Sequence, residues 1–436
     1  MAALLEGGNA FDAAVAAALA ETVALPSKCG LAGDVVAVFR RAGESAPTSL
    51  IALGAAAAGL HDAAAAAGWD LPATGGLSVG VPGAPAGYDR LAALGLLGRA
   101  RLAAPARALA RRGMVWSPLT ELLAHESATL LRTHQPAGTV YSPATGPRAA
   151  GEVVALPGLD RLLGAFAADG ADLFAGDAGA AVVDRVARAG GVLSREDLCG
   201  VEVLEEPAHG VATAGGPLWA TNFPTYGAAL TELFAAGRDL AEVGPDLVRD
   251  VLDRQARGEL VGAEGTSTVA AADAEGNAVV LVHSNSFPQF GSGLVVEDYD
   301  LVLSNRAGRG FAFVPGHPNS PVAGRRPLTT LHAWATTTDD ADGPGWLLGG
   351  TPGGEQQVPW NAQVLRHLLG RGTTEADLGE ALVGGRWQLD ARGVVAREGQ
   401  ELPALSDRSG HTLARWSAAR VAAAADPRWD GVAVAA

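Results

Sequence analysis

The first part of the chain alternates apolar runs with glycine and proline. Residues 9–24, NAFDAAVAAALAETVA, are mostly apolar, and Asn9 and Pro26 provide the cap and the stop of a helix. Their apolar positions form only a weak stripe, so we predict a largely buried helix. The run DVVAVFRR from Asp34 predicts a strand, and helical segments follow to about residue 240. The first half is therefore predicted to be mostly helical.

The pattern changes to short apolar strands in the second half. TVAAADAEGNAVVLVHSNS places two apolar runs around residues 275–277, Glu-Gly-Asn, which accept positive φ and indicate a hairpin. LVVEDYDLVLSN and GWLLGG predict further strands, and residues 361–369 predict a helix. Residues 240–265 are polar and charged, and we expect the lowest order there. The second half is predicted to be strand-rich.

Composition narrows the classes of function. The 436 residues are 48% hydrophobic, which is enough for a large core, although this length leaves the number of domains open. A formal net charge of -15 and the lack of a Lys/Arg run argue against nucleic acid as a partner. No run of 18 uncharged apolar residues indicates a membrane span, and the first 25 residues lack a basic leader. We expect a cytoplasmic protein from the chain as written, and a secreted or periplasmic one if its N-terminus is incomplete.

Common catalytic and cofactor motifs give little support. Residues 76–80 match G-x-S-x-G, but LPATG precedes them and VPGAPAG follows, whereas a nucleophile elbow needs a strand and then a helix. The nine histidines lack metal-ligand spacing, and Cys29 and Cys199 form no Cys-x-x-Cys pair, so no metal is expected and one long-range disulfide stays open. No phosphate-binding glycine motif is present, and we expect no cofactor.

Two segments become informative only when they are considered together. GTSTVAAADAEGNAVV starts a strand with three hydroxyl residues, although a threonine at a strand start is ordinary. LLGGTPGGEQQ has a Gly-Gly pair after a strand, and such a pair forms either a plain turn or an oxyanion hole of backbone N–H groups. A nucleophile and an oxyanion hole are the two parts that an acyl-transfer enzyme requires.

Many segments together resemble the gamma-glutamyltranspeptidase family of N-terminal nucleophile hydrolases. In the first half these are GGNAFDAAVAAALAETVALPSKCGLAGD, VGVPGAPAGYDRL and LFAGDAGAAVVDRVARAGGVLSREDL. In the second half they are GTSTVAAADAEGNAVV, FGSGLVV, PGHPNS, GRRPLTTL, GTPGGEQQ and ADPRWDGVAVA. The segments follow the order of the family and cover almost the whole chain.

The resemblance implies an α+β fold, a four-layer αββα sandwich made as one precursor. Cleavage between Gly265 and Thr266 would divide it into a mostly helical large subunit, residues 1–265, and a strand-rich catalytic small subunit, residues 266–436. The two would stay intertwined as one domain. The freed Thr266 amine, with an ordinary pKa of about 8, could act as the base for its own hydroxyl. Ser267 is the expected helper.

Further site residues are carried over from matching positions of the family. Ser284 matches a threonine that positions the nucleophile's amine, and Gly353 and Gly354 match the oxyanion hole. Thr329 and Thr330 match a serine pair that holds the substrate's α-carboxylate. The machinery for acyl attack is therefore expected to be retained.

The residues that recognise a glutamyl group in the family are largely replaced. Residues 53–55, Leu-Gly-Ala, stand where an arginine holds the carboxylate. SNRAGRGF contains Asn305, Arg306 and Arg309 where acidic and amide groups hold the ammonium, and an arginine cannot do so. Ser286, or the neighbouring asparagine, stands where another substrate-binding asparagine is expected.

We therefore expect an N-terminal-threonine amidase or acylase whose small-molecule acyl group lacks the α-ammonium. A dicarboxylic acyl such as glutaryl could pair with Arg306 and Arg309. A tailoring step on a secondary metabolite, including hydrolytic carbon–carbon cleavage, is a second option. Conventional gamma-glutamyl transfer or glutathione hydrolysis is one alternative, and an inactive member acting as a binding or scaffold protein is another. A homodimer could cover an exposed sheet edge.

Overall fold

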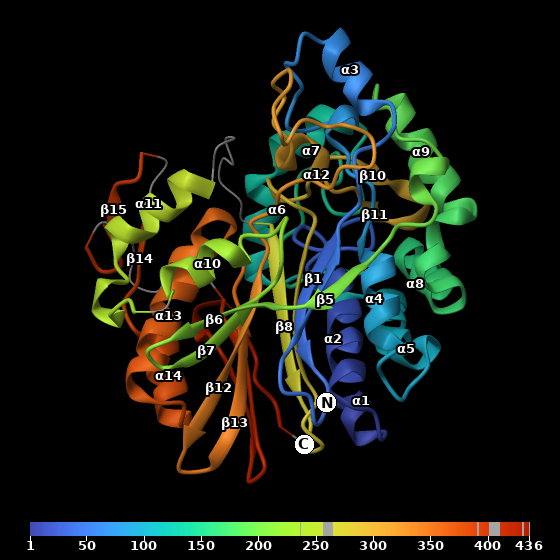
Figure 1. The fold of residues 1–436 in the computed structure, drawn as a ribbon. Coiled ribbons are helices and arrows are strands. Elements are labelled where there is room, and N and C mark those ends of the chain that lie inside the picture. The colour runs from blue at the N-terminus through green and yellow to red at the C-terminus, as the bar shows by residue number, and fades with distance from the viewer. Residues whose placement is uncertain (236, 256–264, 390–391, 401–409, 430, 436) are drawn as a thin grey trace.

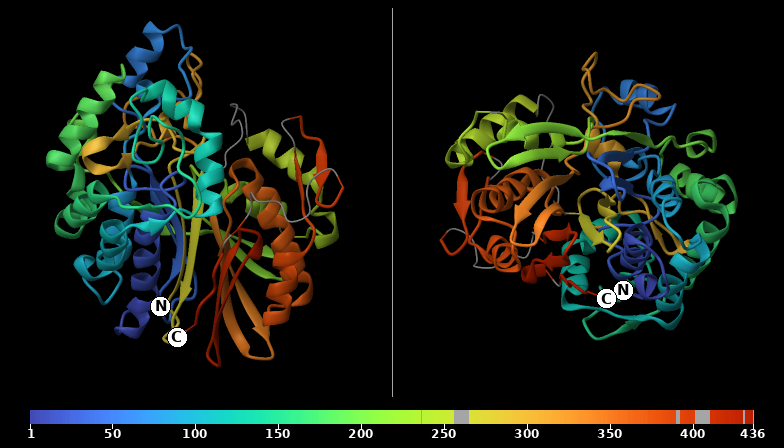
Figure 2. Two further views of the ribbon diagram at one scale, coloured as in Figure 1. Left: turned by 180° about the vertical axis from the view of Figure 1, so that it is seen from behind. Right: turned by 60° about the horizontal axis from the view of Figure 1, so that its bottom comes forward.

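Two antiparallel sheets lie face to face between two layers of helices (Figure 1). The structure is a computed structural model, and it describes residues 1–436 except 236, 256–264, 390–391, 401–409, 430 and 436. The sequence of layers, helix, sheet, sheet, helix, confirms the predicted αββα sandwich. Figure 2 shows the two ends of the chain side by side at one end of the sandwich.

The first sheet combines strands from both halves of the chain, all antiparallel to their neighbours. Its order is β5 (Leu204–Pro207), β2 (Thr48–Ala52), β1 (Asp34–Arg40), β9 (Ala278–Ser284) and β8 (Thr266–Ala272). The strand β8 is therefore an edge strand, and β9 lies between it and the first-half strand β1.

The second sheet also combines strands from both halves and is antiparallel throughout. Its order is β17 (Val421–Ala425), β16 (Thr412–Ser417), β13 (Gly343–Gly350), β12 (Ala333–Asp340), β7 (Gly216–Ala220) and β6 (His209–Thr213). The central strands β12 and β13 come from the second half of the chain.

Each sheet has a helical layer packed on its outer face. The first sheet is covered by α2 (Ala10–Ala24), α4 (Ala84–Ala92), α5 (Arg99–Arg112), α8 (Pro157–Asp169) and α9 (Asp177–Arg188). The second is covered by α10 (Gly227–Leu233), α11 (Pro245–Gln255), α13 (Gln357–Arg371) and α14 (Glu375–Val383). Shorter elements are α1 (Ala2–Leu5), α3 (Leu60–Ala66), α6 (Pro118–Glu126), α7 (Ala128–His134), α12 (Arg306–Gly310), β3 (Met114–Val115), β4 (Val153–Val154), β10 (Val295–Val296), β11 (Leu301–Val302), β14 (Trp387–Leu389) and β15 (Val395–Arg397).

The alternation of side chains explains why residues 35–39 of β1 are all apolar. Val36 and Val38 face the second sheet, whereas Val35, Ala37 and Phe39 face the helices. A strand that is buried on both faces needs apolar residues at every position, since successive side chains point to opposite faces. The same alternation decides which residues of β8 and β9 face the space between the sheets.

Most predicted elements are present, with some differences at their ends. The helix α2 begins after Asn9, whose side chain accepts hydrogen bonds from the next two N–H groups in a capping box. The hairpin is β8 and β9, and α13 extends beyond the predicted residues 361–369 at both ends. Within the described part of the chain, each helix is too short or too polar to span a bilayer.

Three expectations need correction. The low-order stretch 240–265 includes the helix α11, and residues 256–264 lie outside the described residues. The first half also contributes the strands β2, β5, β6 and β7, which sequence patterns did not indicate. The long-range disulfide is absent, because Cys29 and Cys199 are both free thiols.

Candidate active site

The candidate nucleophile lies in a row of three polar residues across the first sheet. Thr266 is opposite Ser284 of β9, and Ser284 is opposite Asp34 of β1. Residues directly opposite one another in antiparallel strands project to the same face. Val282 and Val36, two positions along these strands, face the second sheet. Thr266, Ser284 and Asp34 therefore face the space between the two sheets at one end of the sandwich.

A single hydroxyl links the candidate nucleophile to the carbonyl that precedes it. Thr266 Oγ1 donates to Ser284 Oγ at 3.2 Å, and Ser284 Oγ donates to the carbonyl oxygen of Gly265. The N–H of Ser286 donates to the same Ser284 oxygen at 2.8 Å. These bonds use the one proton and both lone pairs of the Ser284 hydroxyl. Ser284 is thus oriented to polarise the Gly265 carbonyl beside the Thr266 hydroxyl.

The structure does not bring the side chain of Ser267 to that of Thr266. Ser267 is opposite His283 in the register of β8 and β9, whereas Thr266 is opposite Ser284. Successive strand residues project to opposite faces, so Ser267 faces the helical layer. Any help that Ser267 gives to Thr266 must therefore pass through the backbone.

The glycine pair begins the turn between β13 and α13. Gly353 has φ 126° and Gly354 has φ 55°, values that favour glycine. A Cβ atom on Gly353 would lie 2.2 Å from the Trp360 ring. Gly350, the last residue of β13, lies against β8, because a Cβ atom on it would be 3.1 Å from Thr268 Cγ2. The turn with the glycine pair therefore begins beside β8. Both turn glycines supply backbone N–H groups close to the start of a helix, where partial positive charge gathers.

The threonine pair lies on the second sheet's side of the same end. Thr329 pairs with Thr225 in an isolated bridge, and the Thr330 hydroxyl accepts a hydrogen bond from Gln357 Nε2 at 3.3 Å. The Thr330 carbonyl lies 2.8 Å from His332 Nδ1. Burial lowers the pKa of His332 to about 4, so its ring is neutral and Nδ1–H is the donor. The two threonines are buried and are held from several sides.

The arginine loop has partners inside the protein. Arg306 Nε donates to Asp34 Oδ2 at 2.6 Å, and both side chains are buried. Burial raises the pKa of Asp34, while the Arg306 charge opposes that rise. The expected pairing of Arg306 with a substrate carboxylate must therefore compete with Asp34. Asp34 is a candidate site residue that sequence patterns did not single out, although a carboxylate at the start of a buried strand is an available signal.

The neighbouring side chains of this loop organise the chain around Ser286. Asn305 Nδ2 donates to the carbonyl oxygens of Ala73 and Phe287, each at 2.7 Å. Arg309 Nε donates to the Phe287 carbonyl at 3.2 Å, and its guanidinium lies 5.4 Å from the Phe287 ring centroid. Burial lowers the pKa of Arg309, and the Glu355 carboxylate opposes this. Arg309 thus lies within electrostatic range of Glu355, which directly follows the Gly353-Gly354 pair.

The buried pair of Asp34 and Arg306 leads to a stability prediction. Asp34→Asn leaves the Arg306 charge buried without its counter-ion, so the free energy of unfolding should fall by about 3 kcal/mol in denaturant titrations. Asp62→Asn is the control, because Asp62 is almost fully exposed beside His61 and should change this free energy by less than about 0.5 kcal/mol. Equal effects of the two changes would contradict the role given to Asp34.

Comparison with known proteins identifies the family. A family profile described as gamma-glutamyltranspeptidase matches residues 1–236 and 239–436. The acylase ACY 1 proenzyme of Pseudomonas sp. (strain SE83) is 32% identical over 220 residues, which are 48% of this chain and 39% of the acylase. Glutathione hydrolase proenzyme 1 of Schizosaccharomyces pombe is 30% identical over 224 residues, 49% of this chain and 35% of that protein. The matched part thus spans well under half the length of these relatives.

Solved structures agree with the fold. Cephalosporin acylase from Bacillus halodurans has a TM-score of 0.81 and 23% identity, with 100% of this chain and 92% of that chain covered. The gamma-glutamyltranspeptidase of Helicobacter pylori has a TM-score of 0.52 and 22% identity, with 58% and 77% covered. With the profile matched over nearly every residue, the chain belongs to the gamma-glutamyltranspeptidase family.

Proposed function

We propose that the protein is a self-processing N-terminal-threonine hydrolase that acts on an amide of a dicarboxylic acid. The proposal of self-processing rests on the Ser284 hydroxyl, which is hydrogen-bonded to both the Thr266 hydroxyl and the Gly265 carbonyl. A nucleophile, a polarised carbonyl and a shared proton path are then in place at one peptide bond. The family match supports the same assignment.

In the processing step, Thr266 Oγ1 attacks the Gly265 carbonyl carbon. The Thr266 proton passes to Ser284 Oγ as the Ser284 proton passes to the carbonyl oxygen, so no charge is left on either hydroxyl. The tetrahedral carbon then expels the Thr266 nitrogen, which takes the proton of the new hydroxyl, so the peptide bond is replaced by an ester and the Thr266 amine is free. Water hydrolyses that ester to a Gly265 carboxylate and restores the Thr266 hydroxyl. Residues 1–265 and 266–436 would then be the two subunits of one intertwined domain, consistent with sheets that contain strands of both.

In the catalytic step, the freed amine takes the proton of Thr266 Oγ1 as the oxygen attacks the substrate amide. The N–H groups of Gly353 and Gly354 stabilise the oxyanion, and each such donor contributes about 3 kcal/mol. The protonated amine gives its proton to the leaving amine. Water then hydrolyses the acyl ester and restores the enzyme.

The charge around α12 favours an acyl group without an ammonium. Arg306 and Arg309 occupy this helix, and a guanidinium cannot accept a hydrogen bond from a substrate ammonium. Arg306 is paired with Asp34, and the Glu355 carboxylate acts on Arg309, so a distal substrate carboxylate at Arg309 would compete with Glu355. The name of the acylase relative supports an acylase assignment, whereas the glutathione hydrolase relative supports the conventional alternative.

Two chromogenic amides test the substrate class. We expect the purified protein to hydrolyse glutaryl-p-nitroanilide and to leave gamma-glutamyl-p-nitroanilide largely intact. Arg309→Gln should lower kcat/KM for the glutaryl amide by about tenfold or more, because a charge-assisted hydrogen bond is lost. Arg41→Gln, at an exposed turn, is the matched control and should change neither rate. Robust turnover of the gamma-glutamyl amide with none of the glutaryl amide would sink the proposal.

A further inference from the structure

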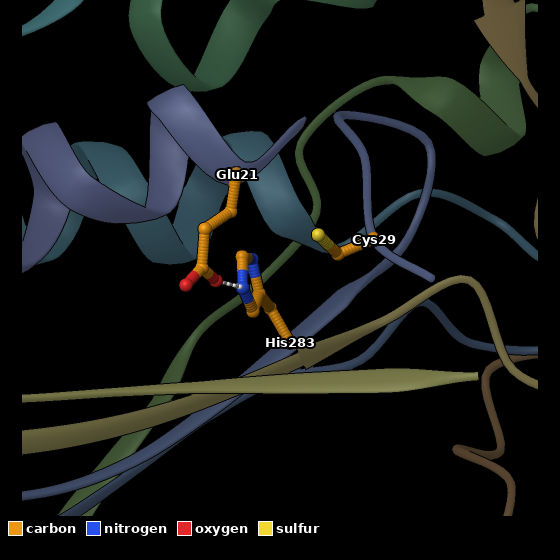
Figure 3. Close-up of side chains that lie close together, drawn as sticks. All are labelled: Glu21, Cys29 and His283. Carbon is orange, nitrogen blue, oxygen red and sulfur yellow. Dashed lines mark hydrogen bonds and ion pairs between the residues drawn. The ribbon is translucent and has the colours of Figure 1, made fainter. Parts of the chain in front are cut away.

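Three side chains with metal-binding atoms meet behind the strand that carries Ser284 (Figure 3). Glu21 comes from α2, Cys29 from the loop after that helix, and His283 from β9. One carboxylate oxygen, the Cys29 sulfur and one imidazole nitrogen all lie within 4.8 Å of one another. Cys29 and His283 are buried and Glu21 is partly exposed. The group is separate from Thr266, because His283 faces the helices and Thr266 the other sheet.

The imidazole is held from both of its nitrogens. His283 Nε2 lies 2.7 Å from Glu21 Oε2, and Nδ1 lies 2.6 Å from the Tyr88 hydroxyl oxygen. Tyr88 is itself fully buried in the helical layer. In metal sites a ligand histidine is usually oriented in this way, with its second nitrogen hydrogen-bonded to a fixed partner. The Tyr88 contact on Nδ1 therefore leaves Nε2, which lies beside Glu21, as the nitrogen available to a metal ion.

We propose that Glu21, Cys29 and His283 form a Zn²⁺ site with a water molecule as the fourth ligand. Carboxylate, thiolate and imidazole are the ligand types that Zn²⁺ takes, and three protein ligands with one water form a common arrangement. The carboxylate and the thiolate carry two negative charges, which a dication would balance, and the buried Lys28 adds a positive charge beside Cys29. The ligand atoms lie within 4.8 Å of one another, so shifts of about 1 Å would bring them to the spacing of a tetrahedral zinc site.

Metal binding changes the protonation of this group in a defined way. Burial, together with the Glu21 charge, raises the pKa of the Cys29 thiol well above its usual value, and Lys28 opposes this. Zn²⁺ displaces the thiol proton, which leaves to solvent. For Nε2 to bind the ion, the His283 ring must carry its proton on Nδ1, toward Tyr88.

An entry path is present on the side of Glu21. This residue lines a groove of about 1670 Å³ that also follows β8, and its side chain is 28% exposed. An ion can reach the carboxylate from the groove and then bind the two buried ligands. The bound ion would fix α2 and the loop after it to β9, one residue before Ser284.

Cobalt titration tests the site in the full chain, because a thiolate bound to Co²⁺ gives a charge-transfer absorption in the near ultraviolet. We expect one equivalent of Co²⁺ to bind, to give this band, and to be displaced by Zn²⁺. Cys29→Ser should remove the band and lower the affinity at least tenfold. The matched control is Cys199→Ser, since Cys199 is an exposed cysteine distant in sequence, and it should leave both unchanged.

A second variant separates a metal site from a hydrogen-bonded trio without metal. Tyr88→Phe keeps all three ligands and removes only the partner of Nδ1, so Co²⁺ affinity should fall by about 10–100-fold while the band remains. Circular dichroism checks that each variant is folded. If Cys29→Ser does not fold, X-ray absorption of the zinc-loaded wild type must show one sulfur ligand. The absence of a thiolate band in the wild type, or its persistence in Cys29→Ser, would overturn the site, whether or not the chain cleaves itself.

Discussion

Thr266→Ala is expected to leave the protein as one chain, whereas the wild type should separate into residues 1–265 and 266–436 on a denaturing gel. The variant lacks the hydroxyl that attacks the Gly265 carbonyl, so neither processing nor amide hydrolysis can start. Amidase activity should fall by roughly 10⁴-fold or more, as for other nucleophile deletions. Intact-mass measurement of both proteins gives the position of the cut.

Thr268→Val provides the matched control for this prediction, because it removes the hydroxyl and keeps the Cγ2 atom that faces Gly350. Thr268 lies two residues along β8, on the same face and buried, and its hydroxyl has no hydrogen-bond partner among the described residues. Its loss should leave both cleavage and hydrolysis close to wild type. Cleavage that persists in Thr266→Ala would exclude Thr266 as the attacking residue, and a wild type that stays intact after long incubation would favour a scaffold role.

The parts of the candidate site that sequence analysis anticipated are those carried by local patterns. Thr266 begins a hairpin whose turn residues are visible in the sequence, and the Gly353-Gly354 pair follows an apolar run. Each signal spans fewer than twenty residues, so periodicity and turn chemistry are sufficient to place it. The family resemblance then relates the two to one another.

The parts that sequence analysis missed depend on contacts between distant segments. Asp34 and Arg306 are 272 residues apart in the chain, and Glu21 and His283 are 262 apart. Nothing in either segment indicates its partner, because β9 is brought beside β1 only by the order of the sheet. For the same reason the spacing of the histidines gave no sign of the cluster around His283.

The missed strands have a related explanation. The strands β5, β6 and β7 are four or five residues long, contain glycine or proline, and include the outer strand of each sheet. The edge strands β5 and β6 bury only part of their surface, so their sequences need little apolar alternation, whereas β7 lies between β12 and β6. Their place is decided by pairing with β2 and β12, which is not a local property.

Gly353→Ala is expected to separate processing from catalysis. The substitution places a Cβ atom 2.2 Å from the Trp360 ring at a φ of 126°, so the backbone of the turn must rearrange. The N–H groups of Gly353 and Gly354 would then no longer converge on the substrate oxyanion. Processing uses the Ser284 hydroxyl at the Gly265 carbonyl instead, so the variant should still be cleaved.

The expected loss is in kcat, because oxyanion donors act mainly in the transition state. With whichever p-nitroanilide the wild type hydrolyses, kcat should fall by about 10²–10³-fold in the cleaved Gly353→Ala protein. Gly43→Ala is the control for strain alone, since Gly43 has φ 81° and open space around its Cβ position. A cleaved Gly353→Ala protein with the kcat of the Gly43 control would mean that the oxyanion is stabilised elsewhere. A Gly353→Ala protein that stays uncleaved would mean that the glycine pair is needed for both reactions. The Ser284 hydroxyl alone would then be insufficient to polarise the Gly265 carbonyl.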